Sequence, residues 1–296
     1  MSDFWQLTFS GFSLGFQYVL VALSITVILR ASGILSIFQG GMVLLGGYLT
    51  YAAHQQWHLP FVLAVLVALL ICAGLNAGVE RLVLRRASHA SELAAVFLTF
   101  GLLLVFEEVV EAIWGSQPLD LGDPWAFGTI DVAGLKVAER DLWAILLAGV
   151  ALVGVYLLFS RTRLGLSMRA NASDSEAASA QGIRPGTVLG VSWGLAGALG
   201  ALAGVLMTTS VGGGVRPDVS IAAFAALPAI YLGGAGSPLG AVVGGLGIGL
   251  AQQYAAGYSP DFLGNSFSTV FPYIVLVLVL IVRPQGFFGT RAVRRA

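Results

Sequence analysis

Lysine and cysteine each occur once in this chain of 296 residues, and charged residues of all kinds make up only 10% of it. The single cysteine, Cys72, lies within an apolar run, so an intrachain disulfide is excluded. The single lysine, Lys136, lacks the glycine-rich context of a phosphate-binding loop, in which lysine is followed by serine or threonine. The chain therefore carries no ATP-hydrolysing motor of that type.

Apolar residues are abundant instead. Hydrophobic residues account for 57% of the chain, and the mean hydropathy is +0.88. Too little polar sequence remains to cover a water-soluble globule of this length. The composition predicts an all-α, polytopic integral membrane protein with about eight transmembrane or re-entrant helices, because a helical span needs about 20 apolar residues. We expect one transmembrane domain over residues 1–296.

Two of the apolar blocks are irregular. The block 33–51 is rich in glycine and contains Ser36 and Gln39, which predicts a tilted, broken or re-entrant helix. The block 221–232 is short, and Pro228 interrupts it. Ser36, Gln39 and Pro228 are our candidates for a solute pathway, although helix packing would explain them almost as well. The regular blocks are 11–29, 60–79, 93–113, 142–159, 187–209, 239–255 and 268–282.

Arginine positions predict the orientation, because basic residues concentrate on the cytoplasmic side of membrane proteins. The segment 114–141 between two arginine clusters is mainly acidic and predicts an external loop. The C-terminus is predicted to be cytoplasmic. Three full crossings before Arg81 would place the N-terminus outside, whereas a re-entrant block 33–51 would place it inside. The clusters are Arg81, Arg85 and Arg86; Arg161, Arg163, Arg169 and Arg184; and Arg283, Arg291, Arg294 and Arg295.

The polar segment 161–186 is long enough to form a helix of its own. Ser173 and Glu176 have the spacing of a capping box at a helix N-terminus. Gly182 suits a left-handed C-terminal cap, and Pro185 prevents the helix from continuing. These signals predict a helix of about two turns over 174–181. So short a helix is marginal in water, so we expect it to need a partner surface, the alternative being a solvated loop helix.

Three motifs follow one another along the chain. The first combines Arg163–Gly165, Met168–Ala170 and Glu176–Ala178, followed by Gly182 and Ile183. The others are the runs 232–241 (LGGAGSPLGA) and 283–289 (RPQGFFG). In this order the motifs resemble the branched-chain amino acid permease family of bacterial ATP-binding-cassette (ABC) importers, and the first resembles the cytoplasmic coupling segment of these permeases. The residues that the resemblance assigns to ATPase coupling are Arg169, Ser173, Glu176, Ala177, Ala178 and Gly182.

The resemblance implies a permease without enzymatic activity or bound cofactor, in which separate subunits use ATP. It also implies an ATPase pair, a second permease subunit that is related or identical, an extracytoplasmic solute-binding protein and a lipid environment, with no nucleic acid. The location would be the bacterial inner membrane, crossed several times. The cargo would be branched-chain amino acids or related small polar solutes. A secondary transporter or channel acting without ATP is the alternative, disfavoured by the scarcity of charge within the spans.

The chain departs from the family pattern at two places. Ser36–Gly41 (SIFQGG) stands where family members usually carry an asparagine-phenylalanine-alanine-histidine-glycine-glutamate run. Ala225 or a neighbour replaces the family's lysine ahead of paired glycines. Other polar groups give weaker signals: we expect no metal at the histidines, and we place the acidic group at the outer end of its helix. These residues are His54, His58 and His89, and Glu107, Glu108 and Glu111.

Glycines predict where helices approach one another closely. Gly236, Gly240 and Gly244 are spaced four residues apart, as are Gly245 and Gly249, in and directly before the block 239–255. This spacing places small residues on neighbouring faces of one helix, which allows backbones to pack tightly in lipid. We expect packing within one subunit, with a seam between subunits as the alternative.

Overall fold

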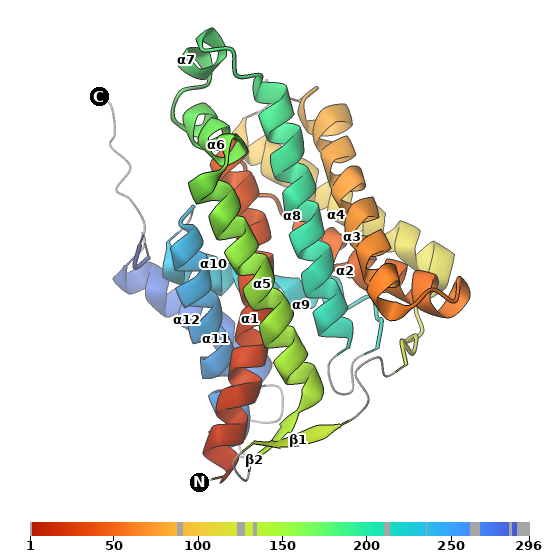
Figure 1. Ribbon diagram of the computed structural model, residues 1–296. Coiled ribbons are helices and arrows are strands. Elements are labelled where there is room, and N and C mark those ends of the chain that lie inside the picture. Colours follow the sequence, from red (N-terminus) through yellow and green to blue (C-terminus); the bar gives the residue numbers. More distant parts are fainter. Residues whose placement is uncertain are drawn as a thin grey trace.

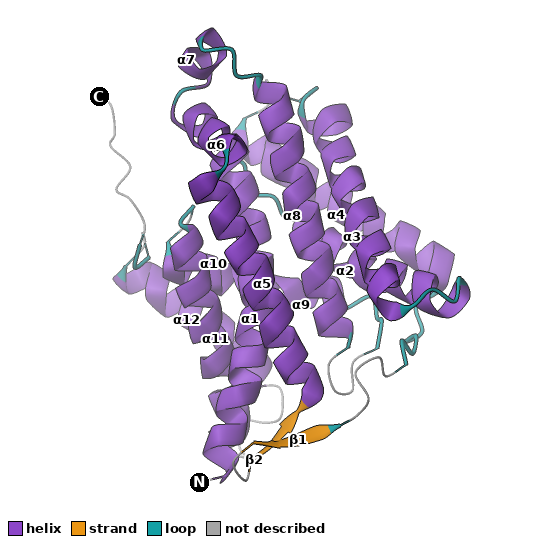
Figure 2. Cartoon of the chain, viewed as in Figure 1, coloured by secondary structure: helices purple, strands orange, loops and turns teal. Residues whose placement is uncertain are grey.

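The computed structural model describes residues 2–87, 91–122, 128–132, 135–209, 214–234, 236–260, 267–283 and 286–288, which are almost entirely helical (Figures 1 and 2). The long helices are α1 (Ser2–Ser32), α3 (Phe61–Val79), α4 (Glu92–Trp114), α5 (Glu139–Arg161), α8 (Pro185–Thr208) and α11 (Pro238–Tyr258). The shorter ones are α2 (Gln39–Tyr51), α6 (Arg163–Ser173), α7 (Ser175–Ala180), α9 (Val219–Ala222), α10 (Leu227–Gly233) and α12 (Phe267–Val282). A hairpin of β1 (Thr129–Val132) and β2 (Leu135–Ala138) pairs Thr129 with Ala138.

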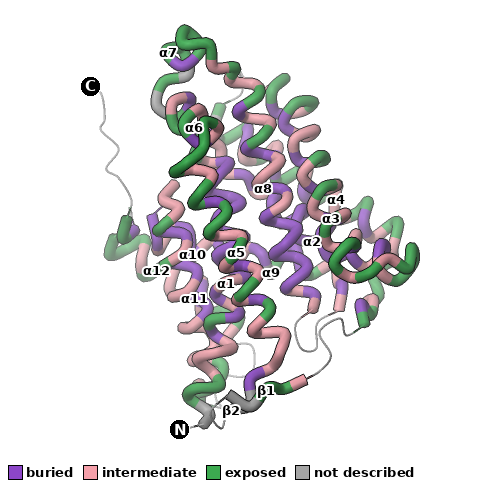
Figure 3. The backbone as a smooth tube through the Cα atoms, in the orientation of Figure 1, coloured by how far each residue is buried: buried purple, intermediate pink, exposed green. Residues whose placement is uncertain are grey.

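Helices α1 and α8 form the centre of the bundle. In their most apolar stretches 78% and 72% of the residues are buried, whereas the share is 17–22% in α3, α4 and α5 (Figure 3). The outer helices turn large apolar side chains away from the protein, among them Leu66, Leu70, Phe97, Val105 and Val150. An apolar exterior of this kind is stable in lipid rather than in water. The protein is therefore an all-α, multi-pass membrane protein, as predicted.

Glycines bring the central helices into backbone contact. A Cβ atom at Gly204 of α8 would meet the carbonyl oxygen of Val43 in α2, and one at Gly249 of α11 would meet the backbone of Gly15 in α1. Gly244 lies in the same way against Ala229 of α10. The glycine series of α11 thus packs within the subunit, as expected, since close backbone approach replaces the hydrophobic effect between helices in lipid.

The two ends of the bundle differ in character. α6 and α7 project at one end, and the N-terminus lies at the opposite end beside the hairpin (Figure 1). There the Ser10 hydroxyl donates a hydrogen bond to Asp141 at 3.4 Å. Of the two alternatives for the N-terminus, the structure favours the side opposite the arginine clusters. The C-terminal residues 289–296, with Arg291, Arg294 and Arg295, lie outside the described residues, so the cytoplasmic C-terminus stays a prediction.

Two apolar blocks are broken, but one break lies elsewhere than expected. Residues 34–36 carry no helix, and α2 begins at Gln39 and continues into a π-helical turn, Ala52–Gln56. The block 221–232 is interrupted by a 3₁₀ turn at Ala223–Ala226 rather than by Pro228, which lies in the first turn of α10. Proline is tolerated at that position because the first turn has no intrahelical acceptor for its missing N–H.

The number of spans stays a prediction. Five of the described helices have the length and composition to cross a membrane individually, namely α1, α3, α4, α5 and α8. The apolar stretches 219–233 and 267–282 are shorter.

We predict that Gly249→Ala lowers the thermal stability of the detergent-solubilised protein. The added methyl group meets the backbone of Gly15, and overpacking of this kind costs about 1–3 kcal/mol. Gly247→Ala on the same helix is the control, because the nearest atom to its Cβ is Leu232 Cδ2 at 3.7 Å. Equal unfolding temperatures for both variants would contradict the close approach of α1 and α11.

Candidate functional site

Arginines from two parts of the chain line one pocket at the end of the bundle where α6 and α7 project. A pocket of about 500 Å³ there is lined by Arg30 from α1, by Glu80 and Arg85 after α3, by Asn171 of α6 and by Trp193 of α8. The third arginine cluster, at the C-terminus, lies mostly outside the described residues. The clustering agrees with a single cytoplasmic face at this end.

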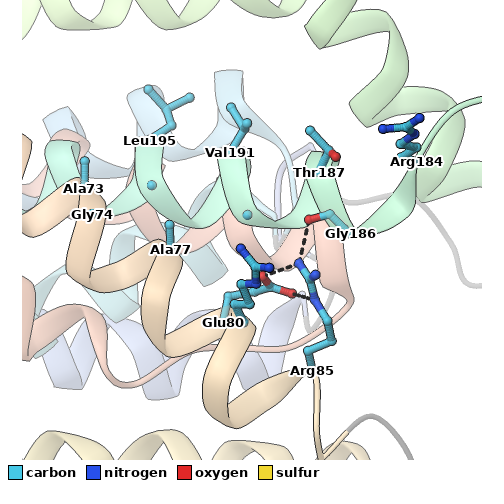
Figure 4. Close-up of a pocket in the computed structure, with 13 residues that line it drawn as sticks. Ala73, Gly74, Ala77, Glu80, Arg85, Arg184, Gly186, Thr187, Val191 and Leu195 are labelled. Atoms are coloured by element: carbon cyan, nitrogen blue, oxygen red, sulfur yellow. Dashed lines mark hydrogen bonds and ion pairs between the residues drawn. The ribbon is translucent and has the colours of Figure 1, made fainter.

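Arg85, which is paired with Glu80 at the end of α3, connects α3 with the start of α8 at this face. Arg85 donates from Nε to Glu80 Oε1 at 3.0 Å and from Nη2 to Glu80 Oε2 at 2.7 Å (Figure 4). Arg85 Nη2 also donates to the carbonyl oxygen of Gly186 at 2.6 Å. Glu80 is buried, so its bidentate partner keeps the charge compensated. The segment that follows α7 is thereby tied to the end of α3.

Helix α6 folds back onto the ends of α1 and α5. Thr162 caps it by accepting a hydrogen bond from the Gly165 amide at 3.1 Å. Arg169 Nη1 donates to the Phe159 carbonyl at 2.6 Å, and Asn171 Nδ2 lies 3.5 Å from the Ala31 carbonyl. Neither the sequence nor the resemblance led us to expect this helix, and it gives Arg169 a structural role at the end of α5.

The predicted two-turn helix exists as α7, but its N-cap is different from the expected one. The Asp174 carboxylate accepts from the amides of Glu176 and Ala177 at 3.0 and 2.9 Å. Ser173 is the last residue of α6, so the assignment of Ser173 as the cap is wrong. Asp174 has φ −158° and ψ 104°, the extended conformation that an N-cap requires.

The C-terminal cap of α7 agrees with the prediction. Gly182 has φ +83°, its amide donates to the Ser179 carbonyl at 2.9 Å, and the Ile183 amide donates to Ala178 at 3.1 Å. This is the Schellman arrangement, which glycine permits because it has no Cβ. On α7 itself Ala178 is buried, whereas Glu176 and Ala177 are exposed. The helix therefore presents a free face beyond the bundle.

A second polar region lies where α2 begins inside the bundle. Ser36 and Gln39 are 1% and 0% exposed, and neither side chain has a hydrogen-bond partner within the described part of the chain. The Ile37 amide donates to Thr99 Oγ1 of α4 at 3.2 Å. A Cβ at Gly40 would lie 3.0 Å from the Ser220 carbonyl of α9, so two interrupted helices meet here.

Pro228 is placed differently from Ser36 and Gln39. It is buried in α10, whose next residue, Ala229, packs on Gly244 of α11. The structure thus joins Ser36 and Gln39 with the start of α9 and gives Pro228 a packing position.

Some polar residues of these two regions were not expected from the sequence. Asn76 donates to the Trp193 carbonyl at 2.6 Å, and its Oδ1 atom has no partner among the described residues. The ion pair between Glu80 and Arg85 was not expected either. Its one signal in the sequence is that an acidic residue, Glu80, stands directly before a cluster of arginines.

The acidic residues of α4 and the histidines form no further candidate site among the described residues. Glu107, Glu108 and Glu111 lie in the last two turns of α4, which ends at Trp114 before Gly115 with φ +84°. The His54 ring bonds the Leu59 carbonyl at 2.9 Å, and His89 lies outside the described residues. Within the described ranges no group of three histidine, cysteine or acidic side chains could hold a metal.

The sequence pattern of a family described as the permease component of the branched-chain amino acid transport system matches residues 7–280. The chain belongs to this permease family. The permease LivH of Salmonella typhimurium is 26% identical to it, over 99% of this chain and 97% of the relative. BraD of Pseudomonas aeruginosa is 25% identical, over 97% and 96%, and the probable permease LivH of Methanocaldococcus jannaschii is 24% identical, over 92% and 88%.

A solved structure supports the fold of this permease. It is PsaBC from Streptococcus pneumoniae in complex with Fab, at a TM-score of 0.53 and 13% identity, over 93% of this chain and 91% of the other. The likeness concerns the arrangement of helices alone. The family is one of transport permeases rather than enzymes.

We predict that Asp174→Ala accelerates amide hydrogen exchange in α7 of this permease about fivefold, because loss of an N-cap costs about 1 kcal/mol. Ser173→Ala is the comparison, since Ser173 ends the preceding helix. Mass spectrometry of exchange over 175–180 measures both. Faster exchange in Ser173→Ala alone would restore the capping box that the sequence suggested.

Proposed function

We propose that this permease is the membrane subunit of an ABC importer for branched-chain amino acids or related small polar solutes in the bacterial inner membrane. The observation that carries the proposal is α7, a capped two-turn helix that exposes Glu176 and Ala177 beyond the bundle. So short a helix gains stability from a partner surface. With no phosphate-binding loop in the chain, separate ATPase subunits are the partners that fit.

The contacts around α7 offer a route by which ATPase movement reaches the spans. Displacement of α7 acts through Gly182 on the start of α8, because only a few residues separate the two helices. The Gly186 carbonyl at the start of α8 accepts a hydrogen bond from Arg85, and Arg85 forms an ion pair with Glu80 at the end of α3. A rigid-body shift of α7 would thus tilt α3 and α8 together, which suits alternating access.

The remaining parts of the proposal rest on the family and on the buried polar side chains Ser36 and Gln39 where α2 begins. The relatives are named as permeases for branched-chain amino acids, and this supports the cargo class. Delivery by an extracytoplasmic binding protein at the end opposite α7, and pairing with a second permease subunit, complete the proposed assembly. Ser36 and Gln39 are the proposed pathway residues, because unpartnered buried polar groups within a membrane span mark functional positions.

We predict that Glu176→Arg and Gly182→Pro each abolish uptake of radiolabelled leucine, isoleucine and valine in cells while the protein stays in the membrane. The first inverts the charge on the exposed face of α7, and the second is incompatible with φ +83° because proline fixes φ near about −65°. Arg86→Gln is the control, because Arg86 is an exposed arginine of another segment, which follows α3. Normal uptake by both variants would refute the coupling assignment.

We predict that Gln39→Leu reduces leucine uptake while preserving or raising the unfolding temperature. Leucine removes two buried polar atoms that have no partner among the described residues, and leaving such atoms unpaired costs about 1–3 kcal/mol each. Uptake and thermal unfolding are measured on the same preparations. Full uptake together with raised stability would show that Gln39 serves packing and takes no part in the pathway.

A further inference from the structure

A groove between α3 and α8 opens at the arginine-rich end of the bundle (Figure 4). Its volume is about 730 Å³, and its two walls come from the last turns of α3 and the first turns of α8. Arginines line the end of the groove near the start of α8, and mainly alanines, glycines and the aliphatic residues Val191 and Leu195 line the rest. One end of the groove is therefore basic, and the rest of it is apolar.

The charge in the groove is unbalanced. Arg81, Arg85 and Arg184 line it together with one acidic residue, Glu80. Arg85 is occupied by Glu80 and by the Gly186 carbonyl. The side chains of Arg81 and Arg184 have no hydrogen-bond or ion-pair partner in the described ranges, and three arginines with one glutamate give the groove a net charge of +2. The N-terminus of α8, which begins at Pro185, adds a favourable dipole for an anion.

The apolar part of the groove is open because its residues are small. A Cβ at Gly74 of α3 would meet no atom within 4 Å, and the nearest atom to a Cβ at Gly190 of α8 is Glu80 Oε2 at 3.7 Å. Gly74 and Val191 are exposed, as are large apolar residues on α3 such as Leu66 and Leu70. This wall therefore faces the lipid.

We propose that the groove binds an anionic phospholipid of the cytoplasmic leaflet. Its phosphate lies by Arg81 and Arg184 at the start of α8, and one acyl chain runs along Gly74 and Gly190. Basic pockets between transmembrane helices at the cytoplasmic side suit such headgroups, and guanidinium groups match phosphate geometry. The continuity of cationic and lipid-facing apolar walls favours a lipid over a soluble anion. The proposal rests on membrane placement, and neither the cargo nor ATP coupling enters it.

Lipid in this groove would bridge the two helices that the hydrogen bond from Arg85 to the Gly186 carbonyl already joins. Its chain would contact both α3 and α8, and its headgroup would lie beside the bond from Arg85 to Gly186. Occupancy would then stabilise the packed arrangement of these helices.

Native mass spectrometry of the full-length chain in detergent tests the site, with phosphatidylglycerol and phosphatidylcholine of identical acyl chains as probes. We expect the first phosphatidylglycerol to bind about thirtyfold more tightly than phosphatidylcholine, from two arginines acting on an anionic headgroup. Arg81→Gln combined with Arg184→Gln should remove this preference, and Arg86→Gln should retain it. Preference that survives the double variant would overturn the proposal.

A second pair of variants tests the acyl groove by itself. The Cβ atom of Gly74→Leu meets no atom within 4 Å, and the rest of the side chain occupies the groove. Binding of both lipids should weaken while the unfolding temperature without lipid is unchanged. Gly154→Leu on α5 is the matched control, since Gly154 is also exposed, open and seven residues before an arginine. Equal lipid binding by the two variants would refute the groove.

Two further outcomes identify other occupants. Glycerol phosphate that displaces phosphatidylglycerol and raises the unfolding temperature equally would show a soluble-anion site. A disulfide between two copies of the Gly74→Cys variant in native membranes would show that a second subunit covers the groove. Either result overturns the lipid assignment. Uptake measurements are independent of these lipid-binding and cross-linking experiments. A negative result for the lipid site therefore leaves the proposed transport function unchanged.

Discussion

Close backbone contact between helices is the constraint on which this structure depends. In lipid, apolar surface gains little by burial between helices, so van der Waals packing of small residues holds the bundle together. Gly204 against Val43 and Gly249 against Gly15 place α2 and α11 directly on the central pair α8 and α1. The outer helices can then expose large apolar side chains to lipid, because the centre is fixed without them.

That tight centre makes its two interruptions significant. Helices α2 and α9 both begin inside the bundle, and their starts meet at Gly40 and Ser220. Irregular backbone within a membrane is tolerated where protein or a cavity surrounds it. Ser36 and Gln39 stand at this junction, and their buried side-chain polar atoms have no hydrogen-bond partner in the part of the chain that the structure describes. In the proposed function these atoms face a solute during transport. The same junction holds the departure from the usual family sequence.

Local sequence signals predicted part of the candidate site. Gly182 was expected to end α7, and its positive φ and the Schellman bonds follow from local preference alone. The N-cap was misassigned because serine and aspartate are about equally good caps. The choice of Asp174 depends on where α6 ends, and α6 is held by Arg169 on Phe159 and by Asn171 near Ala31. Its boundary is thus a tertiary effect.

The sequence by itself determined the membrane class, the helical fold, the family and the clustering of arginines, because composition and motif order record these directly. The tertiary structure decided which arginine side chains form ion pairs and hydrogen bonds. Arg85 pairs with Glu80 and reaches Gly186, a residue 101 positions away. The side chains of Arg81 and Arg184 have no such partner among the described residues. Only the packing of α3 on α8 sets these roles, since arginines are equivalent in sequence until a neighbour supplies an oxygen at bonding distance.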